Sequence, residues 1–523
     1  MAQPQVGRCC KQSVLLLNFS HARWERLLLE RKENNSYAHN AQPARLRHTK
    51  PTVKRGTGYG QMAMEVKRFR RACEVRRCRG YQKKFVLPVN WLLLPQEIFL
   101  KIFMHLSPND KANIRATCSH FRTLIDHPAL WKKSVFVFRD IGIFNVNFLK
   151  MLKTRKVCSV EVCHLKLYHW KRLIATVPDL LNITVHSCLT DEAIKGMKPL
   201  TNLQRLQLTN CSGLQDQKLL SDVCHFQQLT HLWLCDLTLS SSKALVGLCQ
   251  LHNLFSLLIH SKDGFVPKNA LRQVLFQLPK LKELSLSVHN MCHHSMSFCF
   301  SPPEILEGNS GESGCVPRLH LQKLEFIKPG FTVLSATALR QLSTVTTLCL
   351  QHYKAQASDE DLLHLMLQNL PNVTELKLAW SSLFYPTGPV SWIRNLPSTL
   401  EVVHLFTVYI TEPCFSALFS TTSKLRLLDV SFCYGFKESI LKRIPWEFPL
   451  LTKLYLSNIP LTDDTLLTLA HLAHLEELDI SNNHVLTPDA IVHFRGVTKN
   501  SVNIIRKRPA TTVACQIFST LYE

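Results

Sequence analysis

The segment LTKLYLSN, residues 451–458, places apolar residues at its first, fourth and sixth positions and closes on an asparagine. Side chains along an extended strand alternate between its two faces. Leu454 and Leu456 would therefore point into a core, while Lys453 and Tyr455 would face the other way. A turn is expected at the closing asparagine, because its side chain can hydrogen-bond nearby backbone groups. The segment predicts a short strand with one buried face.

The same apolar spacing recurs along most of the chain. Consecutive starts from Leu203 are 24 to 28 residues apart, except for one interval of 40 residues. This pattern and period are the signature of leucine-rich repeats, in which a parallel strand is followed by a helix. The sequence therefore predicts an α/β solenoid, a horseshoe of about 11–13 copies, over residues 136–508. Eleven clear copies begin at Leu203, Leu229, Leu254, Leu281, Leu321, Val345, Val373, Leu400, Leu425, Leu451 and Leu475, with weaker copies at Leu180 and Val157.

The helical half of a repeat is visible in TDDTLLTLAHL, residues 462–472. Thr462 suits the N-cap position, where its side chain can accept a hydrogen bond from the first turn. The leucines that follow fall on one helical face. Asn or Cys also follows several strand segments, as in LTNC at 208–211 and ISNN at 480–483. Such a side chain can hydrogen-bond the turn that leaves the strand.

The long interval contains residues 288–318, which are rich in Pro, Gly and Ser and predict a loop inserted into the solenoid. Its cysteines and histidines raise the possibility of a zinc site, because Cys and His are the usual zinc ligands. The spacing fits no common zinc motif, and adjacent histidines cannot easily face one tetrahedral ion. A surface loop without metal is the favoured interpretation. The residues concerned are Cys292, His293, His294, Cys299 and Cys315.

A short apolar block, residues 88–135, precedes the repeats. Pro95 suits the first turn of a helix. Ser107 can cap a second helix with Asp110 three residues later. The predicted apolar face of the first helix comprises Ile98, Ile102, Phe103 and Leu106, and that of the second comprises Ile114, Cys118, Phe121 and Ile125. Taken as patterning alone, this three-helix block is either a cap on the solenoid or a docking unit for a partner.

Residues 94–131, LPQEIFLKIFMHLSPND through ATCSHFRTLIDHPALW, resemble an F-box. With the repeats, most of residues 88–505 is similar to the F-box and leucine-rich-repeat family. That resemblance implies a substrate receptor of a Skp–cullin–F-box ubiquitin ligase, which contacts the cullin and RING subunits through the Skp adaptor. The residues it implies for adaptor contact are Leu94, Pro95, Ile98, Ile102 and Phe103.

Two residues depart from the family pattern. Phe121 stands where the family usually has Trp, and it fills much of the same space. Lys111 stands where the family usually has an apolar residue. We expect Lys111 to lie near the adaptor surface, which leaves the strength of that contact open.

The concave face of the predicted horseshoe is large enough to bind a protein. The side chains expected to contact a target are His231, Trp233, His260, Phe406, Lys453 and Tyr455. The aromatic members are favoured interface anchors, and partial burial between neighbouring strands is the competing interpretation. The face shows no acid–base dyad and no nucleophile with a base. A non-catalytic protein without a cofactor is therefore predicted.

The chain has 523 residues and 46% hydrophobic residues, which predicts two or more folded units. Its 19 cysteines lie scattered, as expected of reduced thiols. No apolar run approaches the ~18 residues that span a bilayer, and residues 13–19 make a poor signal peptide. We expect a cytoplasmic or nuclear protein with no membrane contact.

Most of the net charge of +24 belongs to residues 1–87, where 20 Lys plus Arg against 5 Asp plus Glu leave +15. These residues predict a largely disordered basic tail, and residues 509–523 a short C-terminal tail. The densest basic run, residues 67–84, could contact nucleic acid or act as a nuclear-import signal. A solvated extension is the favoured interpretation, and nucleic acid is not the expected partner.

Three functions remain open at this point: a ligase receptor, a repeat scaffold whose helical block is only a cap, and a nucleic-acid-associated protein that uses the tail. The first predicts co-purification with the Skp adaptor, and the second predicts none. The third predicts steeply salt-dependent binding that is lost without residues 1–87. The sequence does not name the target protein.

Overall fold

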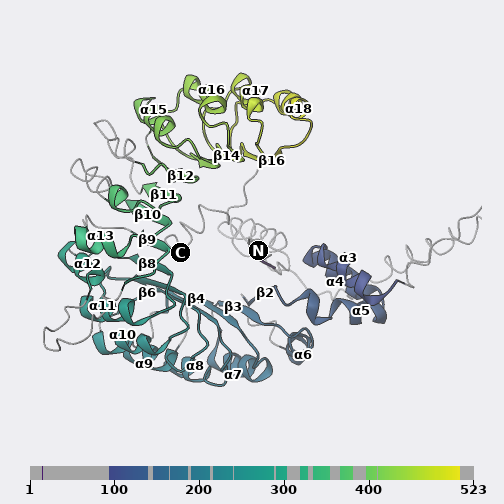
Figure 1. Ribbon diagram of the computed structural model, residues 1–523. Coiled ribbons are helices and arrows are strands. Elements are labelled where there is room, and N and C mark those ends of the chain that lie inside the picture. Colours follow the sequence, from purple (N-terminus) through teal and green to yellow (C-terminus); the bar gives the residue numbers. More distant parts are fainter. Residues whose placement is uncertain are drawn as a thin grey trace, which may run out of the picture. The chain divides into compact units, whose positions relative to one another are not determined.

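The computed structural model shows one curved array of strands and helices and a separate small helical unit (Figure 1). The structure describes residues 14–15, 94–138, 145–163, 165–186, 190–211, 216–239, 241–287, 290–291, 293–302, 318–327, 334–353, 366–380, 396–408, 410 and 412–506. The chain divides at Ile125 and Asp126 into two compact units, and each is treated by itself. The basic run at 67–84 and the C-terminal tail lie outside the described residues.

The small unit contains α3 (Gln96–Met104), α4 (Pro108–Thr117) and α5 (Ser119–Ile125). The predicted cap of α4 is confirmed, because Ser107 Oγ accepts from the Asp110 amide at 3.2 Å and donates to Asp110 Oδ2 at 2.6 Å. The second predicted helix is in fact two helices. Cys118 has extended backbone angles, and its Sγ accepts from the Phe121 amide at 3.5 Å, so it ends α4 and caps α5.

The strands of the large unit form one parallel sheet in chain order, sixteen strands among the described residues. They are β1 (Val14–Leu15), β2 (Val135–Phe138), β3 (Ser159–Cys163), β4 (Asn182–His186), β5 (Arg205–Thr209), β6 (His231–Leu237), β7 (Ser256–Ser261), β8 (Glu283–Ser287), β9 (Lys323–Ile327), β10 (Thr347–Tyr353), β11 (Glu375–Trp380), β12 (Val402–Phe406), β13 (Leu427–Asp429), β14 (Lys453–Tyr455), β15 (Glu477–Asp479) and β16 (Asn503–Ile505).

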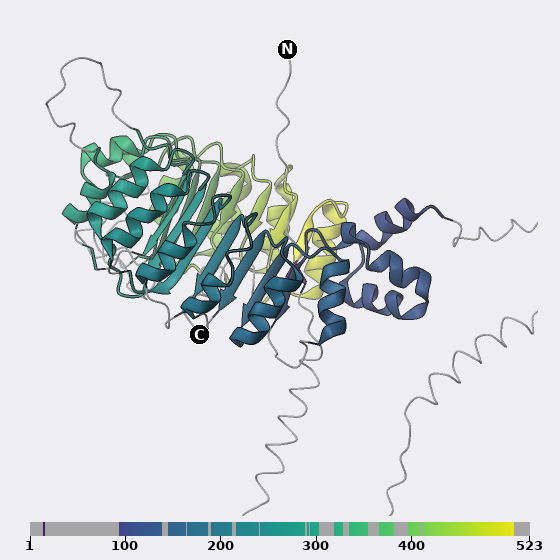
Figure 2. The same ribbon diagram turned by 90° about the horizontal axis from the view of Figure 1, so that it is seen from below.

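Helices cover the outer face of this sheet, and the strands line the inner face (Figures 1 and 2). The helices are α6 (Val146–Thr154), α7 (Leu167–Thr176), α8 (Asp191–Lys195), α9 (Asp216–Val223), α10 (Ser242–Gly247), α11 (Lys268–Gln277), α12 (His293–Phe300), α13 (Ala336–Gln341), α15 (Glu412–Thr421), α16 (Glu438–Glu447), α17 (Asp463–Thr468) and α18 (Pro488–Val497). Thr462 caps α17 by accepting from the Thr465 amide at 3.3 Å, as predicted. This arrangement confirms the leucine-rich-repeat solenoid.

All thirteen predicted copies contain a strand of the sheet. Three strands were missed. β2 reads VFVF and lacks the leucine spacing, β16 lies in a short copy begun by Val502, and β1 pairs with β2 within a segment predicted to be a structureless tail. Each of these three strands lies at or next to one end of the sheet, where a strand has fewer neighbours to match than one in the middle.

The core of the solenoid is a stack of buried apolar side chains from successive strands, most of them leucines. Leu206, Leu232, Leu257 and Leu284 lie side by side in the strand register and are essentially fully buried. Burial of one such side chain contributes about 1.5–3 kcal/mol to the free energy of unfolding. The repeated leucine position therefore stabilises each strand against its two neighbours.

The turns after several strands use asparagine as predicted. Asn483 Nδ2 donates to the Leu456 carbonyl at 2.7 Å, and its Oδ1 accepts from the Ile459 amide at 3.0 Å. Asn458 and Asn482 adopt left-handed backbone angles, φ 55° and 59°, which asparagine tolerates better than most residues. These side chains tie one repeat to the next at the point where the chain leaves the sheet.

The predicted loop at 288–318 is only partly a loop. Residues 293–300 form α12, whose Met296, Cys299 and Phe300 are buried. The Arg272 guanidinium lies 4.3 Å from the centre of the Phe298 ring and donates through Nε to the Ser301 carbonyl at 2.9 Å. The prediction of an extruded loop was therefore wrong for this helix, which is an ordinary outer helix of its repeat. Residues 303–317 lie outside the described part.

No helix in the described part of the chain combines the length and apolar content that a bilayer crossing needs. Among the same residues, no three His, Cys, Asp or Glu side chains are placed to hold a metal ion. Cys292 and Cys315 of the cysteine- and histidine-rich segment lie outside the described residues. Cys299 is buried in α12, and burial raises its pKa to about 12.

Candidate functional site

Helix α3 has two apolar faces that behave differently. Ile98 and Ile102 are 39% and 47% exposed, and Met104 is exposed as well. Ile98 and Ile102 are four residues apart, so they lie one above the other on one side of the helix. Leu94 is half-buried before the helix, and Pro95 is exposed at the N-cap, one residue earlier than predicted. We call Ile98 and Ile102 the exposed α3 face.

The other side of α3 packs inside the small unit. The Phe99 and Phe103 rings lie 5.7 and 6.0 Å from the Phe121 ring, both in edge-to-face geometry. Such aromatic pairs add about 0.5–1.5 kcal/mol beyond the burial of their area. Phe121 therefore fills the centre of this aromatic cluster, as expected for a residue standing where the family has Trp.

Two predictions about this unit were wrong. Phe103 is 5% exposed, so it supports the fold and is not available for adaptor contact. The helical spacing allowed it to join either face, because Phe103 follows Ile102 and lies four residues after Phe99. Lys111 is 6% exposed and lies inside the unit rather than on its surface. A partner therefore meets no Lys111 ammonium group on this unit.

On the concave face of the solenoid, three of the six predicted target-binding residues remain accessible. His231 and Trp233 are half-buried on β6, and Lys453 is half-buried on β14. His231 and Trp233 lie two positions apart, so they point to the same side of the sheet. Together they line a hollow of about 130 Å³ that extends across β2 to β6.

The other three residues are buried, which favours the competing interpretation of burial between neighbouring strands, and their contact with a target stays a prediction. Phe406 packs against Phe432 with ring centres 5.4 Å apart. The Tyr455 hydroxyl donates to Glu477 Oε1 at 2.6 Å. His260 Nε2 lies 2.9 Å from Ser285 Oγ, within hydrogen-bonding distance. In each case the residue contacts a side chain of a neighbouring repeat. Strand alternation alone does not predict these contacts.

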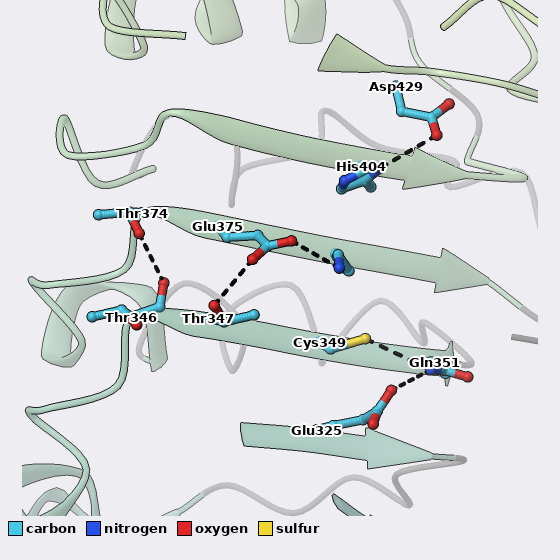
Figure 3. A network of polar contacts seen from close by, with 10 residues as sticks. Glu325, Thr346, Thr347, Cys349, Gln351, Thr374, Glu375, His404 and Asp429 are labelled. Atoms are coloured by element: carbon cyan, nitrogen blue, oxygen red, sulfur yellow. Dashed lines mark hydrogen bonds and ion pairs between the residues drawn. The ribbon is translucent and has the colours of Figure 1, made fainter. Parts of the chain in front are cut away.

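Polar side chains on β9 to β13 make a set of contacts between neighbouring strands (Figure 3). Glu375 Oε1 lies 2.7 Å from Lys377 Nζ, and its Oε2 accepts from Thr347 Oγ1 at 3.1 Å. His404 Nδ1 lies 3.2 Å from Asp429 Oδ2, which comes from the next strand. The apolar spacing of the sequence gives no sign that these polar residues pair with one another.

Within this network the charged groups hold each other ionised. Burial by itself would raise the pKa of Glu375, but the Lys377 ammonium group and the Thr347 hydroxyl bring it below its ordinary value. Burial would likewise lower the pKa of Lys377, and Glu375 raises it above its ordinary value. The neighbouring Cys349 thiol has a raised pKa because it is buried. The network therefore offers an internal ion pair and an unreactive thiol rather than an acid–base pair facing a substrate.

Replacing His260 by glutamine is expected to reduce the loss of stability in acid. Burial lowers the pKa of His260 from 6.5 to about 4, and Glu325 opposes the shift. The unfolded chain takes up a proton there first, so stability is lost as the pH falls from about 6.5 toward 4 and is unaffected above 6.5. Between pH 7 and 4.5 the native chain should lose about 2–3 kcal/mol more than His260→Gln. Urea unfolding followed by circular dichroism at both pH values measures the difference.

His252 supplies the matched control for this experiment, because it is an exposed histidine of the same repeat region. The His252→Gln variant should keep the pH dependence of the native chain. Equal acid sensitivity of the native chain and His260→Gln would contradict the burial argument.

Comparison with known proteins gives one family match and one curated relative. The F-box-like family model matches residues 91–137. A curated relative, the BTB/POZ domain-containing protein FBL11 of Arabidopsis thaliana, is 24% identical over 351 residues. The match covers 64% of this chain and 32% of the relative, so the chain spans about a third of that protein's length.

Solved structures with similar repeats include an internalin from Listeria monocytogenes, at 15% identity and a TM-score of 0.34, covering 66% of this chain and 90% of that one. A leucine-rich-repeat protein of Leptospira interrogans has 16% identity and a TM-score of 0.34, with 72% and 96% covered. A chain from the yeast Rad7 and Elc1 complex has 12% identity and a TM-score of 0.38, with 86% and 96% covered. At these TM-scores the solenoid is assigned from the repeats and parallel sheet of this chain.

The small helical unit and the repeat array thus define the class of protein. An F-box-like segment stands before a leucine-rich-repeat solenoid, and no catalytic domain is evident in the described residues. The chain therefore combines an F-box-like segment with a leucine-rich-repeat solenoid.

Proposed function

We propose that this chain is the substrate-recognition subunit of a Skp–cullin–F-box E3 ubiquitin ligase. In this role the F-box binds the Skp adaptor, and through it the cullin and RING subunits. The repeats bind a target protein for ubiquitination. The chain supplies no chemistry of its own and acts in the cytoplasm or nucleus.

The observation that carries this proposal is the exposed α3 face. A monomeric unit of this size normally buries its large aliphatic side chains, and contiguous exposed ones mark interaction sites. Ile98 and Ile102 lie on a helix of the segment matched by the F-box-like model, and the family resemblance implies both for adaptor contact. The Phe99 and Phe103 side of the helix holds the fold, so the exposed side is free to bind.

The proposal is tested by co-purification. The full-length tagged chain is expressed with the Skp adaptor, a cullin and the RING subunit, and the tagged complex is sized by gel filtration. We expect adaptor and chain in equal amounts, and cullin retained only when the adaptor is present. A chain that elutes alone at micromolar concentration would favour the plain scaffold, in which the helical unit only caps the solenoid.

A further inference from the structure

The hollow on the concave face of β2 to β6 has a chemical character that differs from the rest of this face. It lies at the start of the strands, and Arg205 is exposed at its edge between Asn182 and His231 of the adjacent strands. Gln207 and Trp233 form the next row across the same strands. A guanidinium group, an amide and an indole therefore open onto one small space.

Arg205 gives the hollow its charge. No Asp or Glu is among the residues that line it, and no ion pair of Arg205 occurs within the described residues. Glu161 on β3 lies 3.7 Å from His186 Nε2, a residue outside the lining. Farther along this face, by contrast, Glu375 and Lys377 pair with each other. The hollow is therefore an unpaired positive site beside an aromatic wall.

His231 adds polarity but not charge at neutral pH. Thr230 Oγ1 donates to the Gln204 carbonyl at 2.9 Å, so it accepts from His231 Nδ1 at 2.8 Å. The neutral imidazole then carries its proton on Nδ1 and presents Nε2 as an acceptor. Burial and the Arg205 guanidinium lower the pKa of His231, which keeps it neutral at pH 7. Arg205 is thus the one full positive charge among the residues that line the hollow.

We propose that this hollow binds a single aspartate or glutamate side chain from an extended segment of the target protein, with its carboxylate on Arg205 and its neighbouring apolar residue on Trp233. The proposal deepens the proposed function and rests on it. A volume of about 130 Å³ suits one side chain and is below the ~300 Å³ of common small-molecule sites. One guanidinium matches the single charge of a carboxylate, whereas a phosphate carries nearly two charges.

The test selects random dodecapeptides displayed on phage against the full-length chain and its variants. The native chain should enrich peptides with Asp or Glu at one fixed position next to an apolar residue. Arg205→Glu should select Lys or Arg there instead, and Arg205→Lys should keep the acidic preference. Arg340→Glu is the matched control, because Arg340 is exposed on α13 of the outer face, and it should select the same peptides as the native chain.

A selected peptide is then synthesised with its acid replaced by the corresponding amide. Loss of a charge-assisted hydrogen bond should weaken binding to the native chain about tenfold to a hundredfold. The proposal is overturned by enrichment that Arg205→Glu leaves unchanged, by no acidic position at all, or by tighter binding when phosphoserine replaces the acid. Competition by poly-uridine RNA that disappears in Arg205→Glu would also overturn it.

This experiment separates failure of the site from failure of the proposed function. Arg205 is exposed, so Arg205→Glu should fold and should still co-purify with the Skp adaptor. Adaptor binding without acidic selection would reject the hollow alone, and acidic selection without adaptor binding would reject the ligase assignment alone.

Discussion

Replacing Ile98 and Ile102 together by aspartate is expected to abolish binding of the Skp adaptor while the repeats stay folded. Both side chains are exposed, so two carboxylates there meet water in the free chain. In a complex the same carboxylates would be desolvated against an apolar partner surface, which costs several kcal/mol. We expect at least a hundredfold loss of affinity, measured by adaptor co-purification and by titration of purified components.

The matched control places two aspartates on apolar residues that are also exposed but lie on α18. Val492 and Val497 are 68% and 54% exposed at the far end of the repeats. The Val492→Asp and Val497→Asp double variant adds the same charge and should bind the adaptor like the native chain. Adaptor binding retained by the Ile98 and Ile102 variant would reject the exposed α3 face as the docking surface.

Replacing Phe103 by alanine should also remove adaptor binding, but by unfolding the small unit. Phe103 contacts Phe99 and Phe121 in the aromatic cluster, and truncation of a buried phenylalanine costs about 3–5 kcal/mol. A unit of three short helices has little stability to lose. Limited proteolysis should therefore cut Phe103→Ala within residues 94–125 and leave the repeats intact, whereas the Ile98 and Ile102 variant should resist as the native chain does.

Phe103→Leu serves as the conservative control, since it keeps most of the buried apolar volume. It should resist proteolysis better than Phe103→Ala and retain adaptor binding. A Phe103→Ala variant that folds normally and loses only the adaptor would contradict this purely structural role. Phe103 would then belong to the docking surface.

The repeat array was predictable because its signal is redundant. Each copy repeats the same buried leucine positions, so an error in one copy does not change the period, and the sheet register follows from stacking identical units. The missed strands β1, β2 and β16 lie at or next to the ends of the sheet, where the pattern weakens. The helix α12 was hidden because its sequence, HHSMSFCF, lacks the leucine spacing of the other helices.

The candidate sites were harder to predict because they depend on which neighbour covers a side chain. Strand alternation correctly put His260, Phe406 and Tyr455 on the inner side, yet adjacent repeats bury all three. Helical spacing likewise could not tell whether Phe103 joins Phe99 or Ile102. Periodicity predicts which way a side chain points, but it does not predict how far neighbouring side chains bury it.

The order of the parallel sheet has a consequence for how the protein fails under heat or force. Each strand pairs only with the strands before and after it in the chain, and in the described part β16 pairs with β15 alone. Unfolding should therefore begin at the terminal repeats and proceed toward the middle of the array. A ligand bound across β2 to β6 would stabilise the N-terminal repeats, so unfolding would then start at the β16 end.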